Sequence, residues 1–452
     1  MVGKKYNFDL IVIGSGLAGR TIATTCAREG MRVAVVEDGE FGGDEINRGG
    51  IGLGSLLEMS QAYHTVADGT AWGVGGEGTR LNYVMLHDHA MLTVDDAREK
   101  ALKEFGELEI ELIAGTAKLV NDHEVNVGEE IISAKYIALC TGAVLKENKV
   151  EGLADAGCLD VGGVVTLRKQ PRTVFVVGAG STGCEIAQYF AGIGCRVLLA
   201  DISGRLLPRE DEEVGQVLDK VLNDEKVAVL TQTRVTAVER DSVSRRVMFV
   251  RAGVEHAVRV DEIVIATGET AMVYELGLDN AGVAYDKDGV KHDTTMRTNR
   301  RNIYVAGGCA KGGDNTSLKA FNEGQVAARA ILGDKKVAVD KLDIRVTRTI
   351  PMVVQIGMNE DDCMKEDMHV RKVVVALANA KAFHPPIYMQ EGFVKMIFSG
   401  KQNAIVGTTL MGDGAREGAN TVLGLMKSNV IDPMTLVQMG LWGDVIREAL
   451  KK

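Results

Sequence analysis

Two segments of this chain, Asp9 to Glu37 and Thr173 to Asp201, repeat one pattern, and this repeat limits the fold more than any other feature. Each segment reads as an apolar strand, a glycine turn, a helix, a further glycine and a second apolar strand that ends in an acid. In both copies the acid lies 23 residues after the first glycine, and the copies are 164 residues apart. The repeat predicts an α/β fold with two nucleotide-binding domains of similar build.

Each copy contains the motif G-x-G-x-x-G. The glycines permit a tight turn and a close approach to a pyrophosphate, while the helix N-terminus offers free N–H groups and a positive dipole end. The terminal acid would accept hydrogen bonds from ribose hydroxyls. The alternative, a helix packed on a strand through glycines without a ligand, stays open for either copy. The glycines are Gly14, Gly16 and Gly19 in the first copy and Gly178, Gly180 and Gly183 in the second.

The acids that close the two copies are Glu37 and Asp201. Asp201 would repel the 2′-phosphate of NADP, and no arginine follows it directly in the run ADISG. We therefore expect the second site to take NAD rather than NADP.

Further elements extend this pattern along the chain. Two more strands end in a T-G turn, in the runs YIALCTGA (Tyr136 to Ala143) and EIVIATGE (Glu262 to Glu269). Residues 301–332 read as a strand, a glycine turn and a long helix from about Leu318. The last hundred residues or so differ, because apolar strands alternate with helices near Ala415 to Ser428 and Asp444 to Leu450, an α+β pattern without a nucleotide motif.

The bulk composition narrows the class of protein. A chain of 452 residues can form two to four domains, and its net charge of -10 disfavours binding to nucleic acid or to anionic membranes. No apolar run reaches the length of a membrane span, and the N-terminus lacks the features of a signal peptide, so we expect a cytoplasmic protein. The seven cysteines are scattered without a C-x-x-C motif, which favours reduced, packed thiols.

In this order, these landmarks resemble the flavoprotein pyridine nucleotide-disulfide oxidoreductases, which include dihydrolipoamide dehydrogenase, glutathione reductase and mercuric reductase. The resemblance covers nearly the whole chain and implies two Rossmann-like domains, one for FAD and one for NAD, plus a C-terminal α+β dimerisation domain. It divides the chain into 1–148 (FAD domain, first part), 149–269 (NAD domain), 270–340 (FAD and central domain, second part) and 341–452 (dimerisation domain). By resemblance we expect a homodimer.

The same resemblance assigns residues to the two cofactors. For FAD they are Gly14, Ser15, Gly16, Ala18, Gly19, Glu37, Gly42, Gly43, Ala117, Thr141, Gly142, Gly307 and Gly308. For NAD they are Gly178, Gly180, Ser181, Thr182, Gly183, Asp201 and Gly268.

The stretch after the first nucleotide motif departs from the family. The family reads G-G-T-C-L-N-V-G-C-I-P-S-K, whereas residues 42–54 read GGDEINRGGIGLG, so that Glu45 and Gly50 stand where the redox cysteines would be. Gly54 replaces a lysine whose carboxylate partner matches Glu185. We expect Glu185, having lost that partner, to contact Arg48 or water, or to carry a raised pKa.

Two other family motifs are also altered. In the family's H-P-T-x-x-E, Met439 stands for the histidine and Asp444 for the glutamate, and methionine cannot move a proton. In the turn that matches A-x-G-D, residues 306–309, Gly308 cannot make the contact that an aspartate makes to the ribityl chain of the flavin. Loss of the cysteine pair together with its base indicates loss of the whole dithiol function.

Other constellations receive simpler interpretations. We expect His87 and His89, which flank Asp88, to lie in a solvated polar turn, and we expect no metal site. The acidic run 208–214 is explained by charge at a helix N-terminus without a partner, and the run FHPP at 383–386 by a rigid turn. Cys309 is interpreted as packing, with a redox role beside the flavin as the alternative.

Together these features predict an enzyme that passes a hydride from NADH to FAD and then to a diffusible, quinone-like acceptor without a redox disulfide. Glu45, Arg48, Gly50 and Glu185 are the candidate catalytic residues. Three alternatives stay open. They are transhydrogenase-like activity, electron transfer to a partner protein, and a non-catalytic nucleotide-binding subunit of a larger redox complex.

Overall fold

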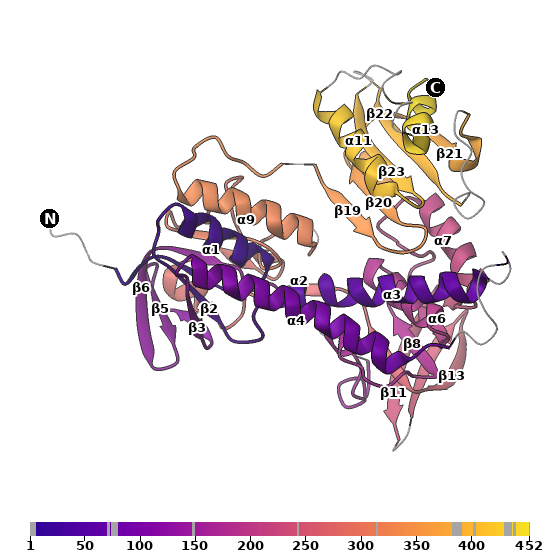
Figure 1. Cartoon of the computed structure of the whole chain (residues 1–452), viewed down its shortest axis with the longest axis horizontal. Helices are drawn as coiled ribbons and strands as arrows, with labels where there is room; N and C mark the ends of the chain where they lie inside the picture. The colour runs from indigo at the N-terminus through magenta and orange to yellow at the C-terminus, as the bar shows by residue number, and fades with distance from the viewer. Residues whose placement is uncertain are drawn as a thin grey trace.

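The computed structural model describes residues 6–69, 73, 80–146, 150–241, 244–312, 315–340, 342–381, 391–400, 404–428, 436 and 440–451. Figure 1 shows three lobes, with the first nucleotide-binding lobe at the left, the second at the lower right and the C-terminal lobe at the upper right. Residues 383–386 and Met439 lie outside the described part of the chain.

The first lobe is built on a sheet with the order β3-β2-β1-β6-β5-β4, to which β18 adds beside β6. β1, β2, β3, β6 and β18 pair in parallel, whereas β4 and β5 are antiparallel additions. Helices α1 (Leu17–Arg28) and α9 (Ser317–Ile331) pack side by side against it, although they are far apart in the sequence (Figure 1). The strands are β1 (Phe8–Ile13), β2 (Val33–Glu37), β3 (Glu111–Ala114), β4 (Ala117–Leu119), β5 (Glu124–Val127), β6 (Glu130–Leu139) and β18 (Ile303–Val305).

The second lobe repeats this arrangement on a smaller scale. Its parallel sheet has the order β10-β9-β8-β14, and a three-stranded antiparallel sheet, β11-β12-β13, lies beside it. The strands are β8 (Thr173–Val177), β9 (Arg196–Ala200), β10 (Ala228–Leu230), β14 (Glu262–Ile265), β11 (Thr233–Arg240), β12 (Arg245–Arg251) and β13 (Val254–Val260). Its helices are α5 (Val161–Val165), α6 (Ser181–Gly192) and α7 (Glu212–Asp224).

Short elements link these two lobes. β7 (Ala143–Leu145) and β15 (Glu269–Ala271) pair where the chain crosses between the lobes. They are followed by α8 (Leu278–Ala281), β16 (Tyr285–Asp286) and β17 (Gly289–Val290).

The C-terminal lobe is an antiparallel sheet covered on one face by helices (Figure 1). The strand order is β19-β20-β23-β22-β21. Its elements are β19 (Ile344–Thr347), β20 (Val353–Gly357), α10 (Glu360–Lys365), β21 (Val370–Ala376), the 3-10 turn Leu377–Asn379, β22 (Phe393–Ser399), β23 (Ile405–Met411), α11 (Ala415–Ser428) and α13 (Gly440–Lys451). The fold class predicted from the sequence, two Rossmann-like domains and an α+β domain, is confirmed.

The glycine-rich stretch after β2 forms helices rather than a loop. α2 (Gly43–Asn47) is followed by α3 (Ile51–Asp68), and the long helix α4 (Tyr83–Glu107) packs along α3 and runs from the first lobe to the second (Figure 1). The prediction of a polar turn at His87 and His89 is wrong, because both residues lie inside α4. His87 is buried and His89 is exposed, so the two rings face different environments and are not placed to share a metal.

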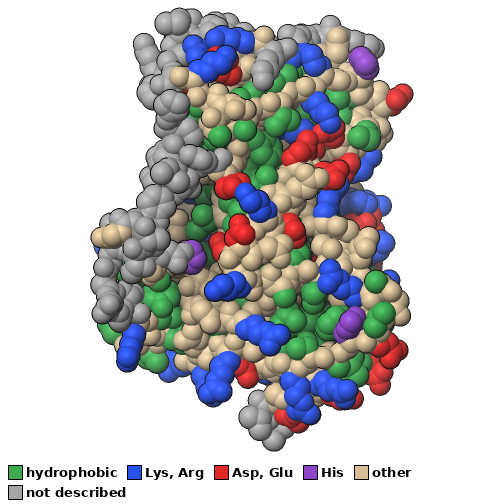
Figure 2. Space-filling model, turned by 90° about the vertical axis from the view of Figure 1, so that its right-hand side faces the viewer, with side chains coloured by type: hydrophobic (Ala, Val, Ile, Leu, Met, Phe, Trp, Pro, Cys, Tyr) green, Lys and Arg blue, Asp and Glu red, His purple; other side chains and the backbone are tan. Residues whose placement is uncertain are grey.

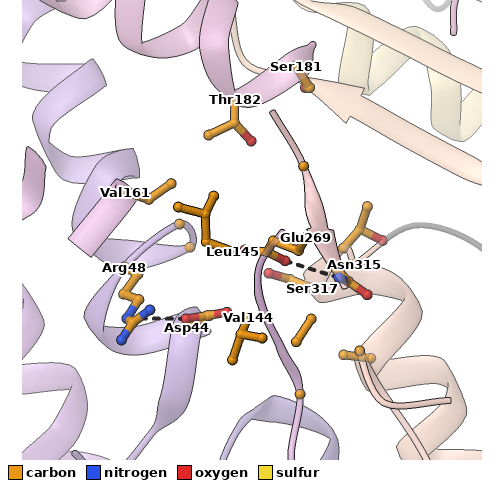
Figure 3. A pocket seen from close by; sticks show the side chains of 18 of the residues that line it. Asp44, Arg48, Val144, Leu145, Val161, Ser181, Thr182, Glu269, Asn315 and Ser317 are labelled. Carbon is orange, nitrogen blue, oxygen red and sulfur yellow. Dashed lines mark hydrogen bonds and ion pairs between the residues drawn. The ribbon is translucent and has the colours of Figure 1, made fainter. Parts of the chain in front are cut away.

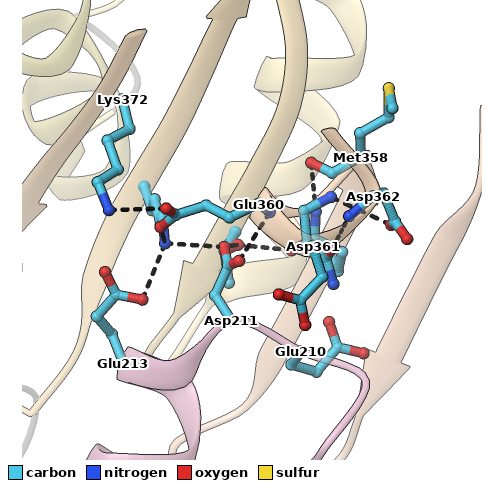
Figure 4. A network of polar contacts seen from close by, with 12 residues as sticks. Glu210, Asp211, Glu213, Met358, Glu360, Asp361, Asp362 and Lys372 are labelled. Atoms are coloured by element: carbon cyan, nitrogen blue, oxygen red, sulfur yellow. Dashed lines mark hydrogen bonds and ion pairs between the residues drawn. The ribbon is translucent and has the colours of Figure 1, made fainter. Parts of the chain in front are cut away.

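The acidic run 208–214 has partners in the C-terminal lobe, which corrects the expectation that helix charge alone explains it. Lys395 on β22 is fully buried, and its Nζ lies 3.1 Å from a carboxylate oxygen of Asp211 and 2.8 Å from one of Glu213. Glu360, at the start of α10, pairs with the same ammonium and with Lys372 (Figure 4). In the described part of the chain, these three acids are the group whose spacing would suit a metal ion, and Lys395 fills its centre.

On the face that Figure 2 shows, acidic and basic side chains are both present among apolar ones, and basic side chains are more frequent in the lower part of the view. In the described part of the chain, none of the helices has both the length and the apolar character that crossing a membrane requires.

Candidate cofactor cavity and active site

One cavity of about 1850 Å³ is lined by both nucleotide motifs. It runs between the lobes, so that residues after β1 and residues after β8 share one continuous space. All four candidate catalytic residues line it, and so do most of the predicted cofactor residues. Those are Gly14, Gly16, Ala18, Glu37, Gly43, Ala117, Thr141, Gly142, Gly307, Gly308, Gly178, Gly180, Ser181, Thr182, Asp201 and Gly268. Ser15, Gly19, Gly42 and Gly183 do not line it and lie in the supporting layer behind the wall.

The two motifs have the same local geometry. Gly14 and Gly178 have φ values of +102° and +104°, a region that favours glycine. A Cβ atom on Gly14 would lie 2.3 Å from the Cys140 carbonyl oxygen, and one on Gly178 would lie 2.4 Å from that of Ala266. The tight turn therefore requires glycine at the first position of each motif.

The middle glycine of each motif faces empty space. A Cβ atom on Gly16 or on Gly180 would meet no atom within 4 Å. Both residues line the cavity and precede a helix, α1 or α6, whose first N–H groups are free to bind an anion. These two cradles fit the pyrophosphate groups of two dinucleotides.

The terminal acids are held at the cavity wall by matching contacts. A carboxylate oxygen of Glu37 accepts hydrogen bonds from the backbone N–H of Ser15 at 2.7 Å and from its hydroxyl at 2.6 Å. Asp201 accepts one from the N–H of Ala179 at 2.6 Å and another from that of Ser203, also at 2.6 Å. Ser15 and Ala179 occupy the same motif position, so the two copies orient their acids by the same device.

Glu45 occupies the room that a side chain at position 50 would need. A Cβ atom on Gly50 would lie 2.2 Å from the backbone oxygen of Glu45 and 2.4 Å from one of its carboxylate oxygens. The Ser317 hydroxyl at the start of α9 donates a hydrogen bond to that carboxylate. The place of a side chain at position 50 is therefore taken by one carboxylate, which is tethered to α9.

Glu185 has a partner that the sequence did not indicate. It contacts neither Arg48 nor a lysine at position 54, because the Arg348 guanidinium lies 2.6 Å from one of its carboxylate oxygens. The backbone N–H of Arg348 donates to the other oxygen at 2.7 Å. The expectation that Glu185 contacts Arg48 is therefore wrong.

Arg48 binds other acids instead. Its guanidinium lies 3.4 Å from carboxylate oxygens of Asp44 and of Asp160 at the cavity wall. All three side chains are about half exposed, so these pairs contribute little to stability and stay accessible to a ligand.

The opposite wall carries Glu269, whose carboxylate accepts a hydrogen bond from Asn315 at 3.0 Å (Figure 3). Partial removal from water by the surrounding walls raises the pKa of Glu269, and the bond to Asn315 opposes that rise. Thr182, Val144 and Leu145 face the same space in Figure 3. The middle of the cavity thus combines apolar surface with a few carboxylates.

The sequence reasoning missed Arg348, Asp44, Glu269, Asn315 and Ser317. Glu269 ends the run EIVIATGE, which already indicated a strand end near a cofactor, so it was within reach. Arg348 has no local signal, because it lies in the run RVTRTIP and meets Glu185 across 163 positions.

The two thiols at or near the cavity, Cys140 and Cys309, are buried. Cys309 is fully buried and its Sγ points to the backbone oxygen of Leu139 at 3.3 Å, which fits packing. Burial raises the pKa of Cys309 and of Cys140, the cysteine that lines the cavity. A thiol kept protonated in this way is a poor nucleophile.

Two further positions that differ from the family motifs, Gly308 and Asp444, lie in the described part of the chain. A Cβ atom on Gly308 would lie 3.0 Å from the backbone N of Ala143, so the backbones approach closely where an aspartate was lost. Asp444 is fully buried and accepts a hydrogen bond from the N–H of Lys381 at 2.8 Å, so it is engaged within its own lobe.

Comparison with known proteins places this cavity in a family. Residues 8–329 match the family described as pyridine nucleotide-disulphide oxidoreductase, and residues 344–432 match its dimerisation domain. The mercuric reductase of Bacillus cereus is 28% identical over 375 residues, which are 82% of this chain and 59% of that protein. The dihydrolipoyl dehydrogenase of Bacillus subtilis is 26% identical over 434 residues, 94% of this chain and 93% of that protein.

A solved structure has the same fold. The Cu(II) complex of the HOCl-induced flavoprotein disulfide reductase RclA from Escherichia coli superposes with a TM-score of 0.81 at 23% identity, covering 94% of this chain and 95% of that chain. The chain spans less than two thirds of the Bacillus cereus mercuric reductase. From these matches and the two cofactor cradles, the chain belongs to the pyridine nucleotide-disulphide oxidoreductase family, a family of FAD-dependent NAD(P)H oxidoreductases.

Proposed function

We propose that this protein oxidises NADH with FAD as its bound cofactor and reduces a diffusible, quinone-like acceptor without using a dithiol. The observation that carries the proposal is the single cavity, which joins both nucleotide cradles and holds Glu45 and Gly50 in place of two thiols. When bound, FAD would supply the ability to take an electron pair from NADH and to release it to a second molecule.

Different residues of the chain would bind each of the two dinucleotides. Gly16 and the start of α1 would hold the pyrophosphate of FAD, and Glu37 its ribose. Gly180 and Asp201 would do the same for NADH, whose ribose hydroxyls suit a carboxylate better than a 2′-phosphate would. The two dinucleotides would then meet in the middle of the cavity.

Glu45 is the group we assign to proton transfer. Reduction of a quinone takes two electrons and two protons, whereas NADH delivers two electrons with one proton, so one more proton must come from the protein or from water. Glu45 lines the cavity, is held by Ser317 and can pass that proton on. Gly49, which has no side chain and no atom within 4 Å of the place its Cβ would take, leaves room beside Glu45 for a flat acceptor.

The absence of thiols at positions 45 and 50 supports an acceptor other than a disulfide. Exchange with a disulfide needs an accessible thiolate, and burial raises the pKa of Cys140 and Cys309. The match of residues 344–432 to a dimerisation domain supports a homodimer.

The test is an anaerobic titration of the FAD-loaded protein with NADH, followed by a screen of acceptors. We expect NADH to bleach the flavin absorbance and quinones to restore it, with no turnover of lipoamide or glutathione disulfide. Turnover of either disulfide would contradict the proposal. Rapid transfer to thio-NAD alone would favour a transhydrogenase, and NADH binding without bleaching would favour a non-catalytic subunit.

A matched pair of variants tests Glu45. Glu45→Gln keeps the size of the side chain and should lower quinone turnover by about a hundredfold, while NADH still bleaches the flavin. Glu58→Gln, on the exposed face of α3 and away from the cavity, should change neither rate. Equal turnover by both variants would remove Glu45 from the mechanism.

A further inference from the structure

The segment that enters the C-terminal lobe is fastened along one face of helix α6. The Ser181 hydroxyl lies 2.6 Å from that of Thr347, and Gln188 exchanges two hydrogen bonds with the backbone of Ile350, at 2.7 and 2.8 Å. Arg348, between these contacts, pairs with Glu185. α6 begins at the second nucleotide motif, so this segment is fixed relative to the cavity.

The Arg348 guanidinium also reaches the stretch that lost its cysteines. Its Nη1 donates to the backbone oxygen of Gly50 at 3.0 Å, and its Nη2 donates to that of Gly49 at 2.8 Å. One side chain therefore joins the loop between α2 and α3, helix α6 and the entry to the C-terminal lobe. Hydrogen bonds from a charged donor are stronger than neutral ones, and the planar guanidinium fixes their directions.

Gly54 gives this side chain its space. A Cβ atom on Gly54 would lie 3.1 Å from Nη1 of Arg348, closer than ordinary van der Waals contact. A long side chain at position 54 would therefore compete with the guanidinium for the same place. The observed position of the Arg348 guanidinium therefore depends on glycine at position 54.

We propose that Arg348 is a positioning residue that shapes and charges the cavity wall at Gly49 and Gly50 from the C-terminal lobe, and that Gly54 admits it. The proposal rests on FAD binding in this cavity, and it does not depend on which acceptor is used. Arg348 neutralises Glu185, whose side chain is only 5% exposed. Without the arginine, a buried carboxylate would face the cavity without a counter-charge.

This arrangement predicts an electrostatic effect on the cofactor. Reduction adds negative charge to a flavin, so an unpaired Glu185 in the wall would disfavour reduction. Arg348→Ala should therefore shift the midpoint potential of bound FAD to more negative values and weaken FAD binding by about tenfold. Arg348→Lys keeps the charge but cannot reproduce the three hydrogen bonds of the planar guanidinium, so it should preserve the potential and lose part of the affinity.

The experiment measures the midpoint potential and the FAD dissociation constant for a set of variants of the full chain. Gln188→Ala removes a neighbouring contact of the same segment without changing charge, so it should lower thermal stability and leave the potential unchanged. Glu185→Gln added to Arg348→Ala should bring the potential back toward that of the parent. Gly54→Lys should lower thermal stability less in the Arg348→Ala background than in the parent chain.

The proposal is overturned if Arg348→Ala keeps the parental potential and affinity, or if Gln188→Ala shifts the potential equally. These results differ from a failure of the proposed function. That failure would appear as a parent protein that does not bind FAD, or as bound FAD that does not pass electrons to quinones.

Discussion

Lys395→Met tests the ion cluster that fastens the second lobe to the C-terminal lobe. The substitution keeps a long apolar side chain on β22 and removes the ammonium from among Asp211, Glu213 and Glu360 (Figure 4). Asp211 stays buried and keeps its bond from the N–H of Glu360, at 3.0 Å. The variant would thus bring three carboxylates together with no cation at their centre, and only Glu360 would keep a partner, Lys372.

The size of the effect follows from burial. At a separation near 3 Å and an effective dielectric constant of about 20, each ion contact amounts to about 5 kcal/mol before desolvation is subtracted. Removing one partner of a buried ion pair costs about 3–5 kcal/mol net, and we expect a loss of unfolding free energy in that range at about pH 7. Lys372→Met is the matched control, since Lys372 meets Glu360 but is 53% exposed, and it should cost at most about 1 kcal/mol.

The loss should shrink in acid. In the parent, the Lys372 and Lys395 contacts hold the pKa of Glu360 below its usual value, so that stabilisation is present above the unfolded pKa and disappears as pH falls through the folded pKa. In the variant, Asp211 and Glu213 would lose the ammonium, their pKa values would rise, and taking up protons would relieve the repulsion between the carboxylates. Both effects reduce the difference in unfolding free energy between parent and variant as pH falls.

Chemical denaturation at two pH values measures the free energies, and hydrogen exchange localises them. Protection should fall in α7 and β22 and stay unchanged in β1 and β6. A Lys395→Met protein as stable as the Lys372→Met control at neutral pH would refute this reasoning, as would a difference that grows in acid.

Three further predictions concern the cavity. Gly50→Ala should lower FAD affinity and thermal stability together, because its Cβ atom would displace the Glu45 backbone, and retention of both parental values would contradict the observed packing. Glu269→Gln should tighten NADH binding at neutral pH, because the parental carboxylate repels an anionic ligand. As pH falls through the raised pKa of Glu269, the NADH affinity of the parent should approach that of the variant, which a fluorescence titration measures. Cys309→Ala should leave NADH-dependent bleaching unchanged and cost about 1 kcal/mol of unfolding free energy, and loss of bleaching would restore a redox role for this thiol.

The parts of the fold that depend on neighbouring residues alone could be predicted from the sequence. The motifs at Gly14 and Gly178 specify their own turns, and the helices after Thr316 and from Ala415 begin where local pattern indicates. The long helix α4 was missed at His87, because two polar side chains there suggested a turn while the helix buries one of them.

Contacts between distant segments could not be predicted in this way. Lys395 and Asp211, like Arg348 and Glu185, carry no mark in the sequence that one belongs with the other, and only the packing of the lobes brings them together. The sequence of residues 42–54 already shows that positions 45 and 50 carry no cysteine. That the Glu45 carboxylate fills the place of a side chain at position 50 could be seen only in the structure.

The contact between Glu45 and Gly50 also restricts the evolutionary future of this chain. A single change of Gly50 to cysteine would drive the new side chain into the backbone oxygen of Glu45, so this first step toward a thiol pair would be selected against. Replacing Glu45 first would release the Ser317 hydroxyl without yet providing a second thiol. A thiol pair at positions 45 and 50 therefore needs two substitutions together with a backbone shift beside Gly50, which no single replacement supplies.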